Sequence, residues 1–220
     1  MNHNICALFD LDGVIVDTAK YHFFAWKKIA KELDYELTEA ANEQLKGISR
    51  VDSLKKIIDW SGVAVSERRF QDFMQIKNDD YLKFIEDINE SDILPGVRDA
   101  LDFLRENRIK IGLGSASKNA VPILDRLSIT PYFKTIIDGN SVSRSKPDPE
   151  VFLKGAKALN VSPNQTVVFE DSTAGIIAAK AGGMTGVALG ETKLFKNADF
   201  CYPDFTAINS QELMRLFSIE

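Results

Sequence analysis

Two carboxylates lie two residues apart near the start of the chain, in residues 9–13 (FDLDG). The apolar residues 5–9 precede them, and a short apolar run that ends in Asp and Gly is typical of a buried strand in a parallel sheet. Side chains at positions i and i+2 point the same way in an extended chain, so Asp10 and Asp12 are expected to lie together. Their repulsion is relieved by a cation, a shared proton or a divergence of the backbone. An Asp-Gly turn alone would explain one Asp and the glycine, but not the other Asp.

Polar residues also follow three later apolar runs of the sequence. They are Ser115, Ser117 and Asn119 after residues 109–114, in the segment that also contains Ala116, then Lys146 after residues 135–137, and Glu170 with Asp171 after residues 166–169. The C-terminal ends of parallel strands share one edge of the sheet, and ligands bind there. The sequence therefore predicts four carboxylates, a lysine and hydroxyl groups at one place.

Each of these later residues also has a purely structural explanation. Ser115 or Ser117 could cap a helix, and Asp171 could cap the helix that starts near residue 172. Lys146 could be a solvated loop lysine. Taken together, however, the residues are hard to explain by structure alone.

Such a set of side chains suits a particular chemistry. Carboxylate oxygens with few cationic neighbours suit Mg²⁺, and a lysine beside the ion would bind a phosphoryl oxygen as a point charge. This combination favours phosphoryl transfer, which depends mostly on positioning and charge neutralisation. An Asp is already ionised at pH 7, since its ordinary pKa is about 4, and can act as a nucleophile without a base. The neighbouring Asp, if it stays off the metal, can serve as acid and base.

Helices and strands alternate in the second part of the chain. Helices are expected over residues 97–107, 119–127, 149–159 and 173–181, and strands over residues 109–114, 135–137, 166–169 and 185–189. This alternation is typical of an α/β protein with a doubly wound parallel sheet. The first strand must join that sheet, because it has no partner of its own.

Residues 17–90 contain no convincing strand, and their apolar residues recur at helical spacing, for example Leu54, Ile57 and Ile58. Ser66 precedes three polar residues and Phe70, a pattern that resembles a helix start. Residues 17–90 are therefore predicted to form an inserted α-helical cap domain. Residues 1–16 and 91–220 are predicted to form the α/β core domain.

Composition limits the classes of partner. The chain has 220 residues, of which 45% are hydrophobic, and a net charge of −5, which argues against a nucleic-acid partner and against an anionic membrane surface. The N-terminal residues show no signal peptide, and the two cysteines form no CxxC motif, so a reducing, cytoplasmic location is expected. No interface helix remains once core and cap are assigned, and a monomer is expected.

The strand-end residues resemble, in order, the four motifs of the haloacid dehalogenase superfamily of phosphotransferases. These are Asp10-x-Asp12-Gly13-Val14, Ser115, Lys146 before Pro147, and Glu170-Asp171-Ser172-x-x-Gly175. The inserted helical segment matches the C1 cap class of that superfamily. Residues 9–26, 45–54, 77–79 and 115–119 further resemble its β-phosphoglucomutase branch. The resemblance spans essentially the whole chain, whereas a lone DxD would be weak.

The resemblance implies a phosphomutase that interconverts β-D-glucose 1-phosphate and glucose 6-phosphate through a β-glucose 1,6-bisphosphate intermediate. Asp10 would carry the phosphoryl group as an aspartyl phosphate, and Asp12 would be the acid and base. Mg²⁺ would be held by Asp10, the backbone carbonyl of Asp12, Glu170 and Asp171. These residues would complete a core site for a small sugar phosphate.

The resemblance also implies the groups that hold the two phosphates. Ser115, Lys146 and the backbone N–H of Ala116 would bind the transferring phosphoryl group. The second, non-transferring phosphate would be held by Arg50, Ser117 and Asn119. Arginine suits this task because its planar fork holds phosphate oxygens in pairs.

Five residues of the cap and hinge are implied as well. Thr18 and His22 would lie near the hinge, where His22 helps to set when Asp12 acts. Lys77 would reach the sugar from the cap, while Trp26 and Gly47 would shape the sugar pocket. From spacing alone, His22 is an ordinary helix residue, Lys77 a solvated charge and Trp26 a core aromatic.

Other functions share parts of this pattern. A phosphatase of a small sugar phosphate would have the same core and a looser cap. A phosphonate hydrolase is disfavoured, because no cap lysine can be placed as a Schiff-base former. A phospho-accepting signalling domain has an acidic cluster and a lysine, but it needs neither a cap nor a second Asp. A binding module without activity is disfavoured because no motif residue has been lost.

Overall fold

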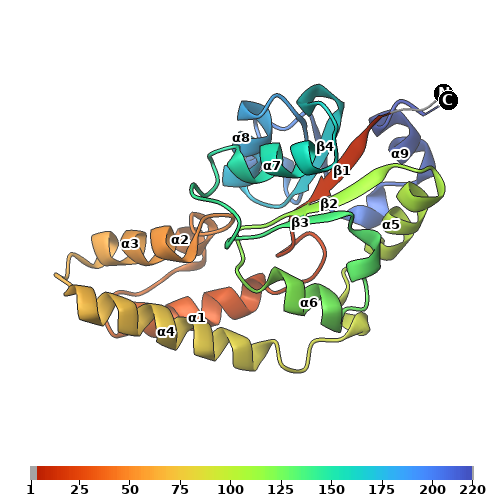
Figure 1. Ribbon diagram of the computed structural model, residues 1–220. Helices are drawn as coiled ribbons and strands as arrows, with labels where there is room; N and C mark the ends of the chain where they lie inside the picture. The colour runs from red at the N-terminus through yellow and green to blue at the C-terminus, as the bar shows by residue number, and fades with distance from the viewer. Residues whose placement is uncertain (1–3, 220) are drawn as a thin grey trace.

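The computed structural model describes residues 4–219 (Figure 1). Residues 1–3 and residue 220 lie outside the described residues. The expected lack of a signal peptide rests partly on residues 1–3, and residue 220 is the end of the predicted core domain. Within the described residues a six-stranded parallel sheet has the strand order β3-β2-β1-β4-β5-β6. The predicted doubly wound parallel sheet is therefore confirmed.

The strands are short and mostly buried, as a sheet covered on both faces requires. Their bounds are β1 Cys6–Phe9, β2 Lys110–Gly114, β3 Thr135–Ile137, β4 Thr166–Glu170, β5 Thr185–Leu189 and β6 Phe200–Tyr202. β1 pairs with both β2 and β4, which places it at the centre of the sheet. The end of β1 is thus flanked by the ends of β2 and β4.

Helices cover both faces of the sheet, and the alternation of side chains along β1 decides which face each residue meets. Ala7 and Phe9 pack with α5 (Val97–Glu106), α6 (Ala120–Arg126) and α9 (Ser210–Leu216). Cys6 and Leu8 pack with α7 (Glu150–Ala158) and α8 (Thr173–Ala181). The sheet therefore has one hydrophobic core on each side.

The segment between β1 and α5 is helical, as predicted. It contains α1 (Ala19–Lys31), α2 (Glu39–Glu43), α3 (Arg50–Ser61) and α4 (Glu67–Phe84), which stand apart from the sheet in Figure 1. These helices have a hydrophobic cluster of their own, which includes Trp26, Leu54 and Ile57. Ser66 is the N-cap of α4, where its side chain accepts from the backbone N–H of Arg69, so the predicted helix start is confirmed.

Three elements were not anticipated: the edge strand β6, the helix α9 and the short helix α2. α2 has five residues, which is too short for the helical period to be recognised in the sequence, and β6 has three, as does the predicted strand β3. Single-turn 3₁₀ helices occur at Glu90–Asp92, Thr130–Tyr132, Pro163–Gln165, Thr192–Leu194 and Phe205–Ala207. Elsewhere the predicted helices and strands match the observed bounds or differ from them by one residue at one or both ends.

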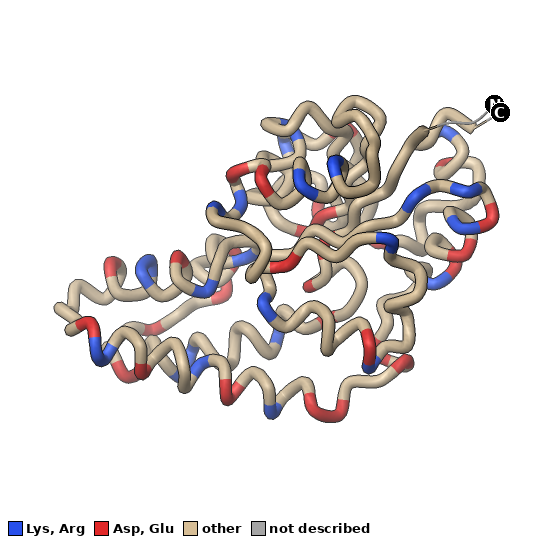
Figure 2. The backbone as a smooth tube through the Cα atoms, viewed as in Figure 1, with Lys and Arg blue, Asp and Glu red and all other residues tan. Residues whose placement is uncertain are grey.

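Basic and acidic residues are intermingled along the cap helices (Figure 2). Some form ion pairs between helices, such as Lys28 of α1 with Asp80 of α4 at 2.6 Å. Exposed pairs of this kind contribute about 0–1 kcal/mol each. No helix within residues 4–219 has the length and apolar character needed to cross a membrane.

Candidate active site

The side chains predicted from the strand ends meet at one edge of the sheet, beneath the cap. A cavity of about 420 Å³ lies there, within the range of sites for small molecules. The predicted residues that line it are Asp10, Asp12, His22, Trp26, Gly47, Arg50, Lys77, Ser115, Ala116, Lys146 and Asp171. The other four, Thr18, Ser117, Asn119 and Glu170, are hydrogen-bonded to lining residues directly or through one intermediate residue.

Lys146 is a buried cation between two carboxylates. Its Nζ lies 2.7 Å from Asp10 Oδ1 and 2.5 Å from Glu170 Oε1, and its side chain is 1% exposed. Burial acts to lower the pKa of Lys146, but the charges of Asp10 and Glu170 outweigh burial and raise it above its ordinary value. Lys146 therefore carries a fixed positive charge, and the alternative of a solvated loop lysine is wrong.

Three carboxylates are arranged as oxygen ligands for a cation. Asp10, Glu170 and Asp171 each offer an oxygen, and these atoms lie within 4.8 Å of one another. Burial raises the pKa of Asp10 to about 7. The charge of Lys146 opposes this rise, and the charges of Glu170 and Asp12 add to it. Burial and the neighbouring carboxylates raise the pKa of Asp171 well above its ordinary value, although Lys46 opposes the rise. A divalent cation fits this set, because a hard oxygen donor set with excess negative charge is what such ions bind.

Two glycines permit the close packing of these carboxylates. Gly13 has φ +78°, and a Cβ there would overlap the Asp171 carboxylate. A Cβ on Gly175 would overlap the Glu170 carboxylate. Glu170 Oε2 is also held by Ser172, whose backbone N–H and Oγ both donate to it at 2.8 Å. The glycines of the first and fourth motifs thus leave room for these carboxylates.

Asp12 differs from this acidic set in having a hydrogen-bond partner of its own. Its Oδ1 accepts a hydrogen bond from Thr18 Oγ1, and His22 Nε2 lies 3.7 Å from the same oxygen, beyond hydrogen-bond distance. The enclosed position raises the pKa of Asp12 although Thr18, Lys77 and Lys146 act to lower it. A carboxyl group with a raised pKa is suited to give and take protons near neutral pH.

His22 is bonded to Lys77 on the neighbouring cap helix. Lys77 Nζ lies 2.6 Å from His22 Nδ1, and His22 Nε2 has no hydrogen-bond partner within residues 4–219. Burial, with the charges of Lys77 and Arg50, lowers the pKa of His22 well below its ordinary value, so the ring is neutral. An imidazole that accepts from Lys77 at Nδ1 carries its proton on Nε2, on the side of Asp12.

Lys77 itself is buried, with 1% of its surface exposed. Its Nζ lies 4.6 Å from the ring centroid of Tyr81 and 5.1 Å from that of Trp26. Burial lowers the pKa of Lys77 to about 7, with Arg50 adding to the effect and Asp12 opposing it. The alternative of a solvated lysine is therefore wrong. Trp26 is both a core aromatic, 3% exposed, and part of the cavity wall.

Arg50 connects the cap to the core through one intermediate residue. Its Nη2 donates to Asn78 Oδ1 at 2.7 Å, and Asn119 Nδ2 donates to the same oxygen at 3.3 Å. Asn119 is the N-cap residue of α6, and its backbone N–H donates to Ser117 Oγ at 3.2 Å. The three residues implied for a second phosphate, Arg50, Ser117 and Asn119, are thus parts of one hydrogen-bonded chain.

Ser115 is fixed by the turn that follows β2. Its Oγ accepts from the backbone N–H of Ser117 at 3.1 Å, and its own N–H donates to the carbonyl of Ile137 in β3 at 2.9 Å. The hydroxyl proton of Ser115 thus stays available for a ligand in the cavity, where Ala116 also lies. Asn119, not a serine, occupies the N-cap position of α6, although Ser117 bonds to it.

Comparison with known proteins agrees with this arrangement. The family model described as haloacid dehalogenase-like hydrolase matches residues 7–189. The chain belongs to the haloacid dehalogenase-like hydrolase family. It is 44% identical to a β-phosphoglucomutase of Bacillus subtilis over 194 residues, 87% of this chain and 86% of the relative. It is 33% identical to a phosphorylated carbohydrates phosphatase of Thermotoga maritima over 80% of this chain and 81% of that protein.

A solved structure supports the same relationship. The crystal structure of a β-phosphoglucomutase from Clostridium difficile superposes with a TM-score of 0.92 at 38% identity, covering 97% of this chain and 96% of that chain. The match extends over nearly the full length of both chains. It therefore includes the helical segment as well as the haloacid dehalogenase-like sheet.

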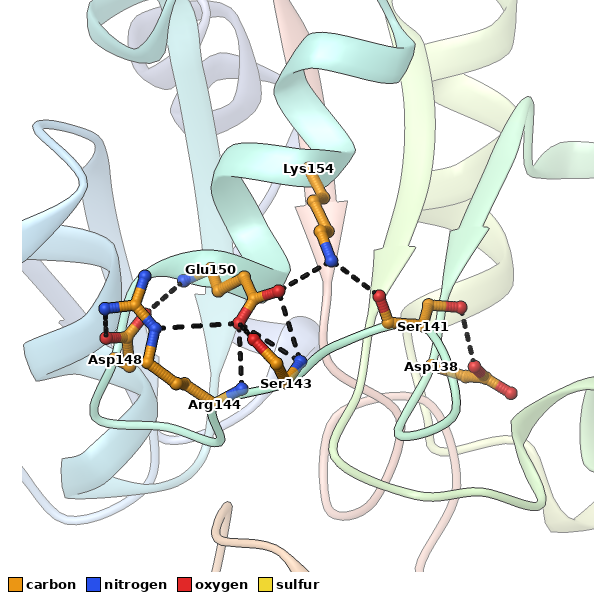
Figure 3. A network of polar contacts seen from close by, with 7 residues as sticks. All are labelled: Asp138, Ser141, Ser143, Arg144, Asp148, Glu150 and Lys154. Atoms are coloured by element: carbon orange, nitrogen blue, oxygen red, sulfur yellow. Dashed lines mark hydrogen bonds and ion pairs between the residues drawn. The ribbon is translucent and has the colours of Figure 1, made fainter.

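The loop that carries Lys146 in this haloacid dehalogenase-like fold is fastened by Glu150, the first residue of α7 (Figure 3). The Glu150 carboxylate accepts from the backbone N–H and Oγ of Ser143 and from the backbone N–H of Arg144 at 2.8 Å. Lys154 pairs with it at 2.6 Å. The Lys154 and Ser143 bonds lower the pKa of Glu150 to about 2. Glu150 therefore stays charged and ties the loop backbone to α7.

Some sequence alternatives are corrected by these contacts. Asp171 does not cap α8, because Ser172 is the N-cap and its Oγ accepts from the N–H of Gly175 at 3.0 Å. Arg50 bonds to Asn78, while the side-chain partners of Asp52 are Ser49 and Ser145. Both cysteines are free, but only Cys6 is fully buried, whereas Cys201 is half-buried.

Several residues of the site were not predicted from the sequence. Lys46 Nζ lies 3.8 Å from Asp171 Oδ2, and Asn78 joins Arg50 to Asn119. Tyr81 is fully buried against His22, with ring centroids 4.1 Å apart. Lys46 precedes Gly47 and Asn78 follows Lys77 in the sequence, and this adjacency to predicted site residues was the only sign of their place in the site. The importance of Tyr81 depends on the packing of α1 against α4.

Proposed function

We propose that this haloacid dehalogenase-like enzyme is a phosphomutase that interconverts β-D-glucose 1-phosphate and glucose 6-phosphate. The observation that carries the proposal is the 44% identity to the Bacillus subtilis β-phosphoglucomutase, which extends across core and cap. The cavity supports it, because a cap arginine, Arg50, and a core lysine, Lys146, both line the same space. Cations from two domains suit a substrate that carries a phosphate at each end during the reaction.

In the proposed reaction Asp10 is the nucleophile and phosphoryl carrier. The phosphoryl group passes from Asp10 to the 6-hydroxyl of β-glucose 1-phosphate while Asp12 takes the hydroxyl proton, which yields β-glucose 1,6-bisphosphate. The bisphosphate turns over, and its other phosphoryl group passes from O1 to Asp10. Asp12 then returns the proton to O1, and glucose 6-phosphate leaves. Lys146, Ser115 and the N–H of Ala116 hold the phosphoryl group during both transfers.

Mg²⁺ is the proposed metal, held by Asp10, the backbone carbonyl of Asp12, Glu170 and Asp171. Bound there, it supplies positive charge that offsets the phosphoryl oxygens and the clustered carboxylates. The geometry of Asp10, Glu170 and Asp171 supports a divalent cation, and the preference for Mg²⁺ rests on hard oxygen ligands shared with a phosphate.

Thr18, His22 and Lys77 support the task of Asp12. Thr18 holds the Asp12 carboxyl in the observed orientation, and the N–H of His22 offers a second partner when the carboxyl turns toward the sugar. Lys77 keeps His22 in the required tautomer from the cap side. Because the chain from Lys77 to Asp12 crosses from α4 to the core loop, the position of the cap controls the proton-transfer group.

Several broader features complete the proposal. Residues 17–90 act as the cap domain, and residues 1–16 and 91–220 as the core. The cap excludes water, which would otherwise hydrolyse the aspartyl phosphate. β-Glucose 1,6-bisphosphate serves as activator as well as intermediate, and the enzyme works as a monomer in the cytoplasm. The competing function is hydrolysis of a sugar phosphate, as the name of the Thermotoga maritima relative suggests for that protein.

The decisive experiment compares transfer with hydrolysis. The purified enzyme is incubated with β-glucose 1-phosphate, Mg²⁺ and a trace of β-glucose 1,6-bisphosphate, and both glucose 6-phosphate and inorganic phosphate are measured. We expect glucose 6-phosphate with little inorganic phosphate. Rapid, stoichiometric release of phosphate would establish the phosphatase instead.

A further inference from the structure

A hydrogen bond joins the cap to the loop that carries Lys146. Ser145 Oγ donates to Asp52 Oδ2 at 2.6 Å, although the two residues are 93 positions apart in the chain. Asp52 is in the first turn of the cap helix α3, and Ser145 directly precedes Lys146 in the core. The contact therefore joins the two parts of the molecule, and both residues line the cavity between them.

Both partners of this bond are held in place by other contacts. The Asp52 carboxylate accepts from Ser49 Oγ at 2.5 Å, and the backbone N–H of Asp52 donates back to Ser49 Oγ at 3.1 Å. Ser145 belongs to the loop that Glu150 ties to α7 (Figure 3). Little conformational entropy remains to be lost when the bond forms, so more of its strength favours the closed arrangement.

The charge of Asp52 strengthens the contact. Partial burial acts to raise the pKa of Asp52, but the hydrogen bonds from Ser145 and Ser49 outweigh it and leave the pKa below its ordinary value. Asp52 is therefore ionised at neutral pH. A hydrogen bond to an ionised acceptor is about twice as strong as one between neutral groups.

Several other polar contacts between cap and core involve groups that the proposed reaction uses. Lys46 faces Asp171, a proposed metal ligand, at 3.8 Å, and Asn78 bonds to Asn119 of the proposed phosphate site at 3.3 Å. Binding of metal and phosphate changes the partners of these groups. At the end of the cap, Arg126 of α6 donates to the backbone carbonyls of Ile85 and Glu86. The bond between Asp52 and Ser145 involves no group of the proposed reaction, so the binding of metal and phosphate leaves its partners unchanged.

We propose that Asp52 and Ser145 form a latch that holds the cap closed and sets how the aspartyl phosphate divides between transfer and hydrolysis. Both act as positioning residues, and the inference rests on the proposed phosphomutase function. When the cap opens, water can attack the phosphorus. The bond from phosphorus to the Asp10 oxygen then breaks, and inorganic phosphate and the free Asp10 carboxylate result. A weaker latch increases the open fraction and with it this loss.

The test removes the donor hydroxyl with Ser145→Ala, which leaves α3 intact. We expect the ratio of inorganic phosphate to glucose 6-phosphate to rise about tenfold, equivalent to about 1.4 kcal/mol in the closing equilibrium. Ser141→Ala is the matched control, since it removes a hydroxyl of the same loop whose partner is Asp138 and not the cap. This control should leave the ratio unchanged.

A double-mutant cycle separates the latch from the capping role of Asp52. Asp52→Ala should raise the ratio at least as much as Ser145→Ala, and adding Ser145→Ala to it should cause little further change. Ser66→Ala, which removes the N-cap of α4, controls for the loss of a cap helix terminus. Fully additive effects of Asp52→Ala and Ser145→Ala would overturn the latch.

A second measurement makes the latch testable apart from the reaction. The radius of gyration of the free protein from small-angle X-ray scattering should increase in Ser145→Ala and Asp52→Ala, but not in Ser141→Ala. If the wild-type enzyme makes no glucose 6-phosphate, the proposed function fails while this measurement still judges the latch. An unchanged radius of gyration, or an unchanged product ratio in an active enzyme, refutes the latch.

Discussion

Replacing Lys77 with methionine should make the protein more stable near neutral pH while it impairs turnover. Lys77 is 1% exposed, and burial lowers its pKa to about 7 from the ordinary value of 10.5. Between these two pH values the unfolded chain binds a proton at Lys77 that the folded protein does not. Stability therefore rises with pH across this interval, and the full cost of the buried amine is present below pH 7.

The size of the effect follows from the two pKa values. At about 1.4 kcal/mol per pH unit, the interval from about 7 to 10.5 corresponds to a cost of about 4–5 kcal/mol at low pH. Methionine removes this cost and nearly fills the same space, but it leaves His22 Nδ1 without its partner, at about 1–3 kcal/mol. We expect Lys77→Met to be more stable than the wild type by about 2 kcal/mol at pH 7. This difference falls by about 3 kcal/mol between pH 7 and pH 9.5, so that the wild type is the more stable protein at pH 9.5, by about 1 kcal/mol.

Urea denaturation of wild type and Lys77→Met at several pH values between 6 and 9.5 measures this difference. Other titrating groups are common to both proteins and cancel in the difference. Lys31→Met on α1 is the control, because Lys31 is exposed and its replacement removes no buried amine, so stability should stay nearly unchanged. A pH-independent difference for Lys77→Met would show that Lys77 stays charged in the folded protein, and the reasoning would be refuted. Phosphomutase turnover should fall in Lys77→Met, since His22 loses the partner that sets its tautomer.

Three further substitutions test the site. Asp10→Asn should abolish the labelled phosphoenzyme formed from β-glucose 1,6-bisphosphate and Mg²⁺, and a normal yield would remove Asp10 as the nucleophile. Arg50→Ala should reduce phosphomutase turnover far more than hydrolysis of a substrate with one phosphate, whereas equal losses would make Arg50 structural. Gly47→Ala places a Cβ against Ser172 Oγ at a backbone φ of +73°. We expect this to cost about 1–2 kcal/mol in cap closure and to raise KM roughly tenfold. An unchanged KM would show that the cap closes without this contact.

Local pattern explains why the core and its motifs were predictable. The apolar runs of the four predicted strands that carry the site are three to six residues long, polar residues follow each of them, and parallel strands place all such ends at one edge of the sheet. The sequence therefore predicts that Asp10, Ser115, Lys146 and Glu170 lie together. The edge strand β6 was not predicted, whereas β3, which also has three residues, was.

The helices of the cap were predictable from the sequence, but the faces that these helices bury were not. Helical spacing identified α3 and α4, and Ser66 marked the start of α4 correctly. Spacing does not say which face of α4 is buried, because that depends on how α1 and α3 pack against it. The polar sequence neighbours of Lys77 therefore predict a solvated side chain, whereas Trp26 and Tyr81 enclose it in the folded protein.

The sequence by itself determined the class of fold, the acidic cluster and the lysine that faces it, because these follow from short-range periodicity and from the geometry of parallel sheets. Only the tertiary structure decided that Lys77 bonds to His22, that Asn78 joins Arg50 to Asn119, and that Ser145 bonds to Asp52. Each of these contacts joins residues that are tens of positions apart. Their partners depend on the placement of the cap over the sheet edge, and no local pattern encodes that placement.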